Sequence, residues 1–455
     1  MPRRSFPSTN SNALPPRPRR WASVTTRHGN CWGSWSKKSP SRATIARWVK
    51  TCAEAAGRVL NHLDQASRPL VVTGCFDEIF FHGKPVLVGV EPRSMAWVLG
   101  EHAADRSGST WTRALQGFEA LEHAVVDGGR GLHRGLVDLE KQRRKEGHST
   151  GLEVSLDVFH TKREGQRVLR KLWNGVESAW SRAEAADRQV QRARRNGENG
   201  RSLGGAAGRA WKKVERLMEG YDRAERAWKR IEAALELFRP DGRLNDRAWA
   251  TGEIAAAVKD LEGAEWGKVR RTLADRRSLT FLDRLQRQLA AAEPRAELRE
   301  ALLRRWWLRR QSAAGGGDGR DAKQDPSVAD AAGRGRWLAT ALVQTEYCRQ
   351  LAANWEESYQ RVAAVLRHTV RASSAVECMN SVLRMHQGRH RTVTQPMLDL
   401  KRLYWNCRPF HSGKRRGRCP YDLLGLKLPT TDWWELLHTA LPDSTQELSS
   451  SEVAI

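Results

Sequence analysis

The chain has few cysteines, and they form no recognisable pattern. Its 455 residues include seven, an odd number, with no C-x-x-C pair: Cys31, Cys52, Cys75, Cys348, Cys378, Cys407 and Cys419. Disulfide scaffolds and zinc sites both require cysteines at regular or clustered spacings. The sequence therefore argues against both and favours a reducing compartment.

Long apolar runs are also missing. No stretch approaches the roughly 20 residues that a membrane-spanning helix needs. The N-terminal residues, MPRRSFPSTNSNALPPRPRRW, are basic but lack the apolar core of a secretory signal. We expect a cytoplasmic protein with no membrane partner.

Acidic residues are in short supply relative to basic ones. Lys and Arg number 78 against 52 Asp and Glu, a formal net charge of +26. Such a surplus indicates a polyanionic partner, most often nucleic acid. A generally basic proteome is the alternative, since Arg greatly exceeds Lys. At this length we expect two or three domains with ample apolar residues for a core.

Three of the acids lie where the chain otherwise reads as apolar strand or as the start of a helix. They are Asp77 in VVTGCFDEIFF, Asp127 in HAVVDGG and Glu377 in SSAVECMNSVLR. A carboxylate in an apolar strand costs several kcal/mol unless a positive charge compensates it. A pair of divalent metal ions would supply that charge, which predicts two-metal phosphoryl-transfer chemistry on nucleic acid.

Residues 68–160 have the alternating pattern of strands, in the order β-β-β-α-β-α-β. We expect RPLVVTGCFDEIFF and PVLVGVEP to form a hairpin around His82-Gly83-Lys84. The order of elements places the first and fourth strands side by side and parallel. Asp77 and Asp127 then lie on neighbouring strands, roughly 4.8 Å apart, where they can share a metal ion.

The flanking segments divide the rest of the chain. We expect a disordered basic, Pro-rich segment at 1–38 and a helical segment at 39–67 that resembles part of a helix-turn-helix. Residues 161–335 read as an all-helical insertion with a flexible loop at 312–327. The core is expected to resume at 336–428 with a helix bearing Glu377 and a basic tail, followed by a C-terminal tail at 429–455.

Two of the candidate acids have competing interpretations. Ser374-x-x-Glu377 also fits a capping box, although Asn380 and Arg384 share the helix face of Glu377. Asp77 is followed by Glu78, which points to the opposite face of the strand, and periodicity does not choose between them. Asp157 with His160, at the end of LEVSLDVF, is a further candidate.

Taken together, CFDEIFF, VVDGGRGL, LDVFHTKRE and the E-x-x-N-x-x-x-R helix followed by YWNCRPFH and CPYDLLG resemble a DDE transposase of a bacterial insertion sequence. The likeness covers roughly 40–160 and 335–428. It implies an RNase H-like α/β core (β-β-β-α-β-α-β-α), interrupted by the helical insertion and preceded by a short helical DNA-binding remnant. Asp77, Asp127 and Glu377 would then be the catalytic metal ligands.

The resemblance also implies cofactors and partners. Two Mg²⁺ or Mn²⁺ ions would be bound, and the partners would be double-stranded DNA, as transposon ends and target, and a second copy of the chain in a homodimer. The protein would be nucleoid-associated. A decayed transposase that only binds DNA and a simple RNase H-like nuclease remain as alternatives. The residues we expect to contact DNA are basic: Arg47, Lys50, Arg384, Arg389, Arg391, Lys401, Arg402, Arg408, Lys414, Arg415 and Arg416.

Overall fold

The protein is a mixed α/β molecule built around one five-stranded sheet. A computed structural model describes residues 41–147, 151–314, 328–388 and 392–438. The chain divides into two units, Met1–Thr51 and Cys52–Ile455. The first contributes only the start of helix α2 (Arg42–Ser67) to the described residues, so the predicted segment at 1–38 lies outside them.

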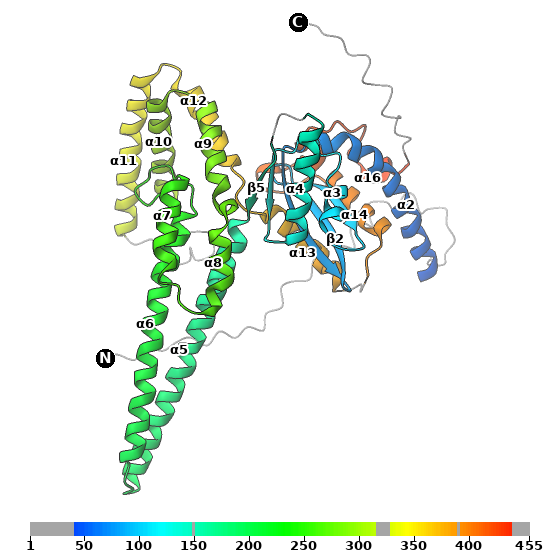
Figure 1. Ribbon diagram of the computed structural model, residues 1–455. Coiled ribbons are helices and arrows are strands. Elements are labelled where there is room, and N and C mark those ends of the chain that lie inside the picture. The colour runs from blue at the N-terminus through cyan, green and yellow to red at the C-terminus, as the bar shows by residue number, and fades with distance from the viewer. Residues whose placement is uncertain (1–40, 148–150, 315–327, 389–391, 439–455) are drawn as a thin grey trace. The chain divides into compact units, whose positions relative to one another are not determined.

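The sheet has the strand order β3-β2-β1-β4-β5 (Figure 1). Strand β1 pairs antiparallel with β2, and β2 with β3, whereas β1 pairs parallel with β4, and β4 with β5. The prediction of parallel first and fourth strands is therefore confirmed. The strands are β1 (Thr73–Phe81), β2 (Lys84–Glu91), β3 (Ala96–His102), β4 (His123–Val126) and β5 (Glu153–Leu156).

The β1–β2 hairpin closes as its sequence predicts. His82 and Gly83, the two turn residues, have φ values of 52° and 80°. Two consecutive positive φ angles are typical of the type I′ turn, whose twist matches that of the flanking strands. The turn fixes the register that pairs Asp77 with Val88.

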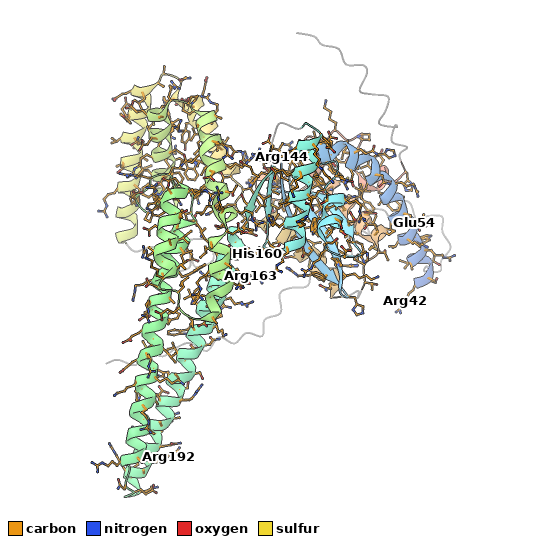
Figure 2. All side chains as sticks on the ribbon, viewed as in Figure 1. Arg42, Glu54, Arg144, His160, Arg163 and Arg192 are labelled. Carbon is orange, nitrogen blue, oxygen red and sulfur yellow. The ribbon has the colours of Figure 1, made fainter. Side chains whose placement is uncertain are left out.

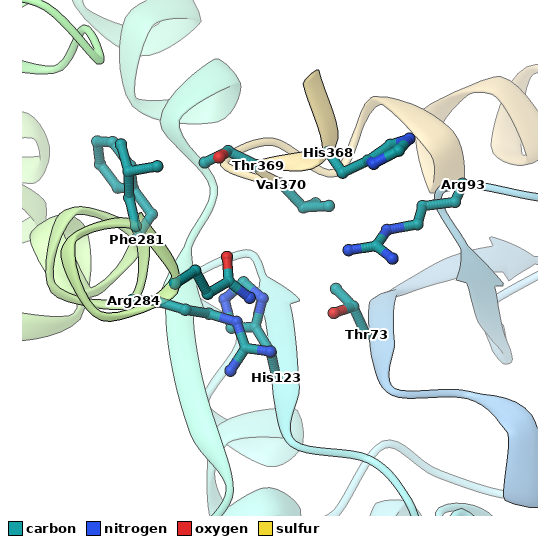
Figure 3. Close-up of a pocket in the computed structure, with 10 residues that line it drawn as sticks. Thr73, Arg93, His123, Phe281, Arg284, His368, Thr369 and Val370 are labelled. Atoms are coloured by element: carbon teal, nitrogen blue, oxygen red, sulfur yellow. The ribbon is translucent and has the colours of Figure 1, made fainter. Parts of the chain in front are cut away.

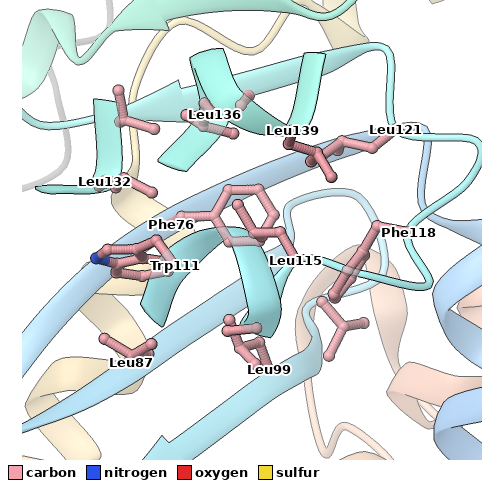
Figure 4. Close-up of a cluster of buried hydrophobic side chains, with 14 of the residues drawn as sticks. Phe76, Leu87, Leu99, Trp111, Leu115, Phe118, Leu121, Leu132, Leu136 and Leu139 are labelled. Atoms are coloured by element: carbon pink, nitrogen blue, oxygen red, sulfur yellow. The ribbon is translucent and has the colours of Figure 1, made fainter. Parts of the chain in front are cut away.

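One face of the sheet is covered by two helices, α3 (Gly108–Ala114) and α4 (Arg130–Lys145). Phe76 and Leu87 project from the strands into a buried cluster with Trp111, Phe118 and Leu136 (Figure 4). Phe76 and Phe118 meet edge to face, 6.0 Å between ring centroids. This apolar layer orients β1 and β4, because their side chains alternate between the two faces of the sheet.

The other face packs against α13 (Ser374–Gln387) and α14 (Gln395–Cys407). Asn406 accepts from the backbone N–H of Trp97 at 2.8 Å and donates to its carbonyl at 3.0 Å. Gln395 makes the same pair of bonds to His102 and Gly100. These amides bond backbone groups of β3, the outermost strand, that would otherwise be open to pairing with another chain.

Between β5 and the segment before α13, the chain forms a helical insertion. Two long helices, α5 and α6, form a hairpin (Figures 1 and 2). Within it, Trp180 packs edge to face on Trp211. Shorter helices follow, and a buried cluster centred on Trp228 and Trp266 joins them to the base of the hairpin. The elements are α5 (Val158–Arg195), α6 (Arg201–Ala234), α7 (Arg247–Val258), η2 (Ala264–Trp266), α8 (Gly267–Ala274), η3 (Arg276–Leu279) and α9 (Thr280–Ala292).

The insertion extends further along the chain than the sequence predicts. Helices α10 (Ala296–Ala314), α11 (Val328–Leu351) and α12 (Trp355–His368) share one buried cluster with α9. The predicted boundary at 335 falls inside α11. An amphipathic pattern shows that a helix is packed but does not identify what it packs against. The predicted loop at 312–327 lies mostly outside the described residues.

The C-terminal segments pack with the second half of α2. Val59, Leu60 and Leu63 share a buried cluster with Tyr421 and Leu436. The predicted tail at 429–455 is therefore packed as far as α16; residues 439–455 lie outside the described part. The elements here are η1 (Arg68–Leu70), η4 (Gly413–Arg415), α15 (Pro420–Leu424) and α16 (Trp433–Leu436). No helix among the described residues is both long and apolar enough to cross a membrane.

A buried ion pair joins α2 to α14. Arg402 is 5% exposed and donates to Asp64 at 3.0 and 2.8 Å and to the carbonyl of Val98 at 3.2 Å. Arg402, which we expected to contact DNA, is thus enclosed by protein and has a structural role. This ion pair could not be predicted from the sequence, because Asp64 and Arg402 are 338 residues apart.

We predict that Arg402→Met destabilises the fold by about 3 kcal/mol, because it leaves Asp64 buried without its main partner. Urea denaturation measures the loss. The exposed Arg408→Met is the matched control and should change stability by less than about 0.5 kcal/mol. Equal stability of the two variants would contradict the structural assignment.

Candidate functional site

Asp77 and Asp127 lie next to each other on the central strands. Phe76 pairs with Val126 in the parallel β1–β4 ladder, so the next residue of each strand is one of the two acids. Asp127 Oδ1 accepts from the Gly129 N–H at 2.9 Å. A Cβ at Gly129 would lie 2.9 Å from that same oxygen, which explains the glycine at this position. The predicted placement of Asp77 and Asp127 on neighbouring parallel strands is confirmed.

A hydrogen bond shows which of Asp77 and Glu78 faces the helix of Glu377. Asn380, fully buried on α13, donates through Nδ2 to Asp77 Oδ2 at 2.7 Å. Glu78 instead pairs with Arg106 at 2.9 Å. Asp77 is therefore the acid on the α13 face.

Asp77 is in an environment that opposes its negative charge. It is 8% exposed, and among the described residues its Oδ1 accepts only the backbone N–H of Glu78, at 2.8 Å. Burial, followed by the charges of Asp127, Glu78 and Glu377, raises its pKa to about 7. These three acids are thus close enough to Asp77 to repel it, and a cation bound among them would relieve the repulsion.

Glu377 lies on α13 one turn before Asn380, and its two oxygens have different partners. His160 Nε2 is 3.1 Å from Oε1, and Arg384 Nη1 is 3.3 Å from Oε2. These ion pairs, with His160 first, lower the pKa of Glu377 to about 2. The carboxylate is therefore charged throughout the physiological range. Helix α13 begins at Ser374 with Ser373 as its N-cap, so Ser374 is not the N-cap residue and Glu377 is not at N3, which argues against the alternative of a capping box.

His160 itself is held by Asp157, so the sequence pair LDVFH does carry a local structure. Asp157 caps α5 by accepting from the Phe159 N–H at 2.6 Å, and its other oxygen lies 2.6 Å from His160 Nδ1. It also accepts from the Ser373 hydroxyl, just before α13. The hydrogen bonds to Asp157 and Glu377 raise the pKa of His160 to about 10. The imidazolium therefore connects the start of the insertion to Glu377.

The donor atoms suit a hard divalent cation. Asp77, Asp127 and Asn380 present oxygens, the ligands that Mg²⁺ and Mn²⁺ prefer. Asn380 Oδ1 and Glu78 Oε2 are buried without a hydrogen-bond partner in the described structure. A buried polar atom without a partner costs free energy, which a cation or its water ligands would recover.

The third carboxylate is not yet part of a preformed centre. Among the described residues, no group of three or more His, Cys, Asp and Glu side chains is arranged to hold a metal ion. Glu377 forms ion pairs with His160 and Arg384. Because a carboxylate has about four lone-pair directions, each of its oxygens can still accept a further partner.

The basic residues expected to contact DNA are distributed unevenly. Arg384, Arg408, Lys414 and Arg416 are exposed, and Arg415 and Lys401 are partly buried. Burial lowers the pKa of Lys401. Arg47 and Lys50 are exposed on the part of α2 that belongs to the first unit. Arg389 and Arg391 lie outside the described residues.

No family model and no curated protein matches this chain. The features that point to a function are the geometry of the carboxylates and the charge of the surfaces around them.

We predict that Mn²⁺ raises the thermal unfolding midpoint of the protein, and does so more at pH 8 than at pH 5.5. Binding requires ionised Asp77, whose pKa of about 7 makes protons compete with the metal below that pH. Calorimetry at both pH values measures the shift. An equal shift at pH 5.5 and 8 would contradict a site built on Asp77.

We also predict that Asp77→Asn stabilises the metal-free protein at pH 8. With a folded pKa of about 7 against roughly 3.9 unfolded, the ionised acid lowers stability as pH rises from 4 to 7, by about 2–4 kcal/mol in all. The neutral amide of the variant avoids this penalty and still has Asn380 as a partner. Urea titrations should show a gain at pH 8 that shrinks towards pH 4; a loss at pH 8 would mean that Asp77 supports the fold.

Proposed function

We propose that this protein is a DDE-type DNA transposase that cuts and joins DNA strands by in-line phosphoryl transfer, on an RNase H-like core. The observation that carries the proposal is the meeting of Asp77 and Asp127 on adjacent parallel strands with Asn380 and Glu377 on the helix that packs against them. The five-stranded mixed sheet and the long helical insertion before that helix are compatible with the interrupted α/β core that the sequence resemblance implies.

Each residue of the site has a separate task under this proposal. Asp77 and Asp127 hold the divalent ions, and Asn380 fixes the orientation of Asp77. Glu377 completes the set from α13, steadied by His160, while Asp157 fixes the imidazole. Arg384 is half exposed beside Glu377, so it is placed to contact a phosphate next to the reacting one.

The remaining parts of the proposal concern substrate and assembly. Bound metal ions supply activation of the attacking hydroxyl and stabilisation of the leaving oxygen. The substrate is double-stranded DNA, held largely through its backbone by the basic residues around α13 and η4, so binding weakens steeply with salt. A homodimer is proposed because two transposon ends must be brought together.

We predict that Asp127→Asn abolishes metal-dependent cleavage of a supercoiled plasmid, by roughly 1,000-fold or more, since a lost ligand removes several kcal/mol of transition-state stabilisation. DNA affinity measured in EDTA should remain near that of the wild type, because Asn retains the bond from Gly129. Asp138→Asn, at a partly exposed position of α4, is the control for loss of one carboxylate and should cleave normally.

The same preparation separates the competing functions. Joined products in a strand-transfer assay support a transposase, whereas cut but never joined products indicate a nuclease. DNA binding by wild type without any Mg²⁺- or Mn²⁺-dependent cutting indicates a protein that only binds DNA. Loss of affinity and cleavage together in Asp127→Asn would mean that Asp127 is structural.

A further inference from the structure

A second feature, which includes none of the three carboxylates, is a basic cleft of about 490 Å³. Its walls come from the β2–β3 turn, the connection from α12 to the start of α13, and η4. The lining residues include six with basic side chains and, among the described residues, no Asp or Glu: Arg93, Arg367, His368, Arg371, Lys414 and Arg415. A smaller cavity of about 10 Å³ shares Arg93, His368, Thr369 and Val370 with it (Figure 3).

Two of these arginines build the walls. Arg415 donates to the carbonyls of Arg93 and Pro92, at 2.8 and 3.1 Å, and so joins η4 to the β2–β3 turn. Arg371 pairs with Glu236 at 2.8 Å and donates to the carbonyl of Leu235. The cleft is thus held by contacts between segments far apart in the chain, and these two side chains already have partners.

The other cations have no such compensation. Within the described part of the chain, no ion pair joins Arg93, Arg367 or Lys414 to a carboxylate. Burial and then the charges of Arg93, Lys414 and Arg367 lower the pKa of His368, which shows that the three cations are grouped around it. The charge of Glu91 acts on His368 in the opposite direction, and this carboxylate accepts from the Ser94 hydroxyl and from backbone N–H groups of the turn. Gathered cations without counter-charges create a positive potential that attracts an anion.

The position of the cleft relates it to the carboxylates. Ser374 and Ala375 line it, and the same helix carries Glu377 one turn later. Val90 pairs with Cys75, so the β2–β3 turn that follows it adjoins the start of β1. Asp127 follows Val126, the last residue of β4, which pairs with Phe76. A chain of phosphates that passes along the start of α13 would therefore contact both places, and a single phosphate would leave most of the cations unused.

We propose that this cleft binds the phosphodiester backbone of a DNA strand beside the carboxylate site, with Arg93, Arg367 and Lys414 as its phosphate contacts. The choice of DNA as ligand rests on the proposed function; the binding itself needs neither metal nor chemistry. Arg93 and Arg367 belong to elements that no local sequence pattern places on a nucleic-acid surface.

The test is fluorescence anisotropy of a labelled 30-base-pair duplex in EDTA, over a series of KCl concentrations. Arg93→Ala with Arg367→Ala removes two phosphate contacts, so the slope of log affinity against log salt should fall by about two. Affinity near 100 mM salt should fall roughly tenfold or more. Both side chains are exposed, so an unchanged unfolding midpoint shows that the variant is folded.

The matched control is Arg192→Ala with Arg194→Ala, exposed residues with the same change of charge. Arg192 lies near the far end of α5 (Figure 2), about 48 Å along the helix from His160 at 1.5 Å per residue. The control should bind like the wild type. An equal loss in both variants, or no loss in the cleft variant, would overturn the proposal.

Competition separates the possible anions. Unlabelled DNA should displace the duplex far better than inorganic pyrophosphate or polyglutamate at equal charge; a polyglutamate as effective as DNA would overturn the assignment to nucleic acid. Plasmid cleavage by the wild type tests the proposed function separately. A smaller salt slope in the cleft variant supports DNA binding by the cleft even if the wild type never cuts DNA. Normal cleavage by the wild type with an unaltered slope in the cleft variant refutes DNA binding by the cleft but leaves the proposed function standing.

Discussion

The hydrogen bond from Asn380 to Asp77 is the contact on which the site depends. It joins residues 303 positions apart and holds α13 in register against β1. Asp77 contributes a carboxylate where strand packing alone would favour an apolar side chain, beside Cys75 and Ile79. Because burial and three neighbouring acids all oppose its ionisation, the arrangement lowers the stability of the fold unless a cation is bound. Such a cost is typical of functional sites rather than of packing.

The sheet could be predicted because its signals are local. Alternating apolar residues marked each strand, His82-Gly83 marked the turn, and the order of elements implied that β1 and β4 are parallel. The neighbourhood of Asp77 and Asp127 followed from that topology alone. The end of the insertion could not be predicted, because α11 and α12 look alike whether they pack on the sheet or on α9 and α10.

The residues of the candidate site could be proposed from the sequence, but the hydrogen bonds and ion pairs between them could not. Periodicity placed Asp77 and Glu78 on opposite faces without saying which face α13 covers, and only the bond from Asn380 does so. Charge counting treated Arg402 and Arg408 alike, although one is buried against Asp64 and the other is exposed. Arg93 and Arg367 are not among the residues predicted to contact DNA, because the sequence does not show that they line one cleft with Lys414. Long-range pairing decides each of these cases, and a single sequence does not encode it in any local pattern.

The insertion contributes to the geometry of the site as well as to the size of the molecule. His160, in the first turn of α5, contacts Glu377, and Asp157 receives the Ser373 hydroxyl immediately before α13. Glu236, just after α6, pairs with both Lys162 and Arg371, and the carbonyl of Arg371 accepts the N–H of Val158. The start of α13 and the residues just before it therefore contact the base of the helical hairpin at several points. A displacement of that base would move Glu377 and one wall of the basic cleft together, so the same contacts that position the third carboxylate also shape the surface proposed to hold the strand beside it.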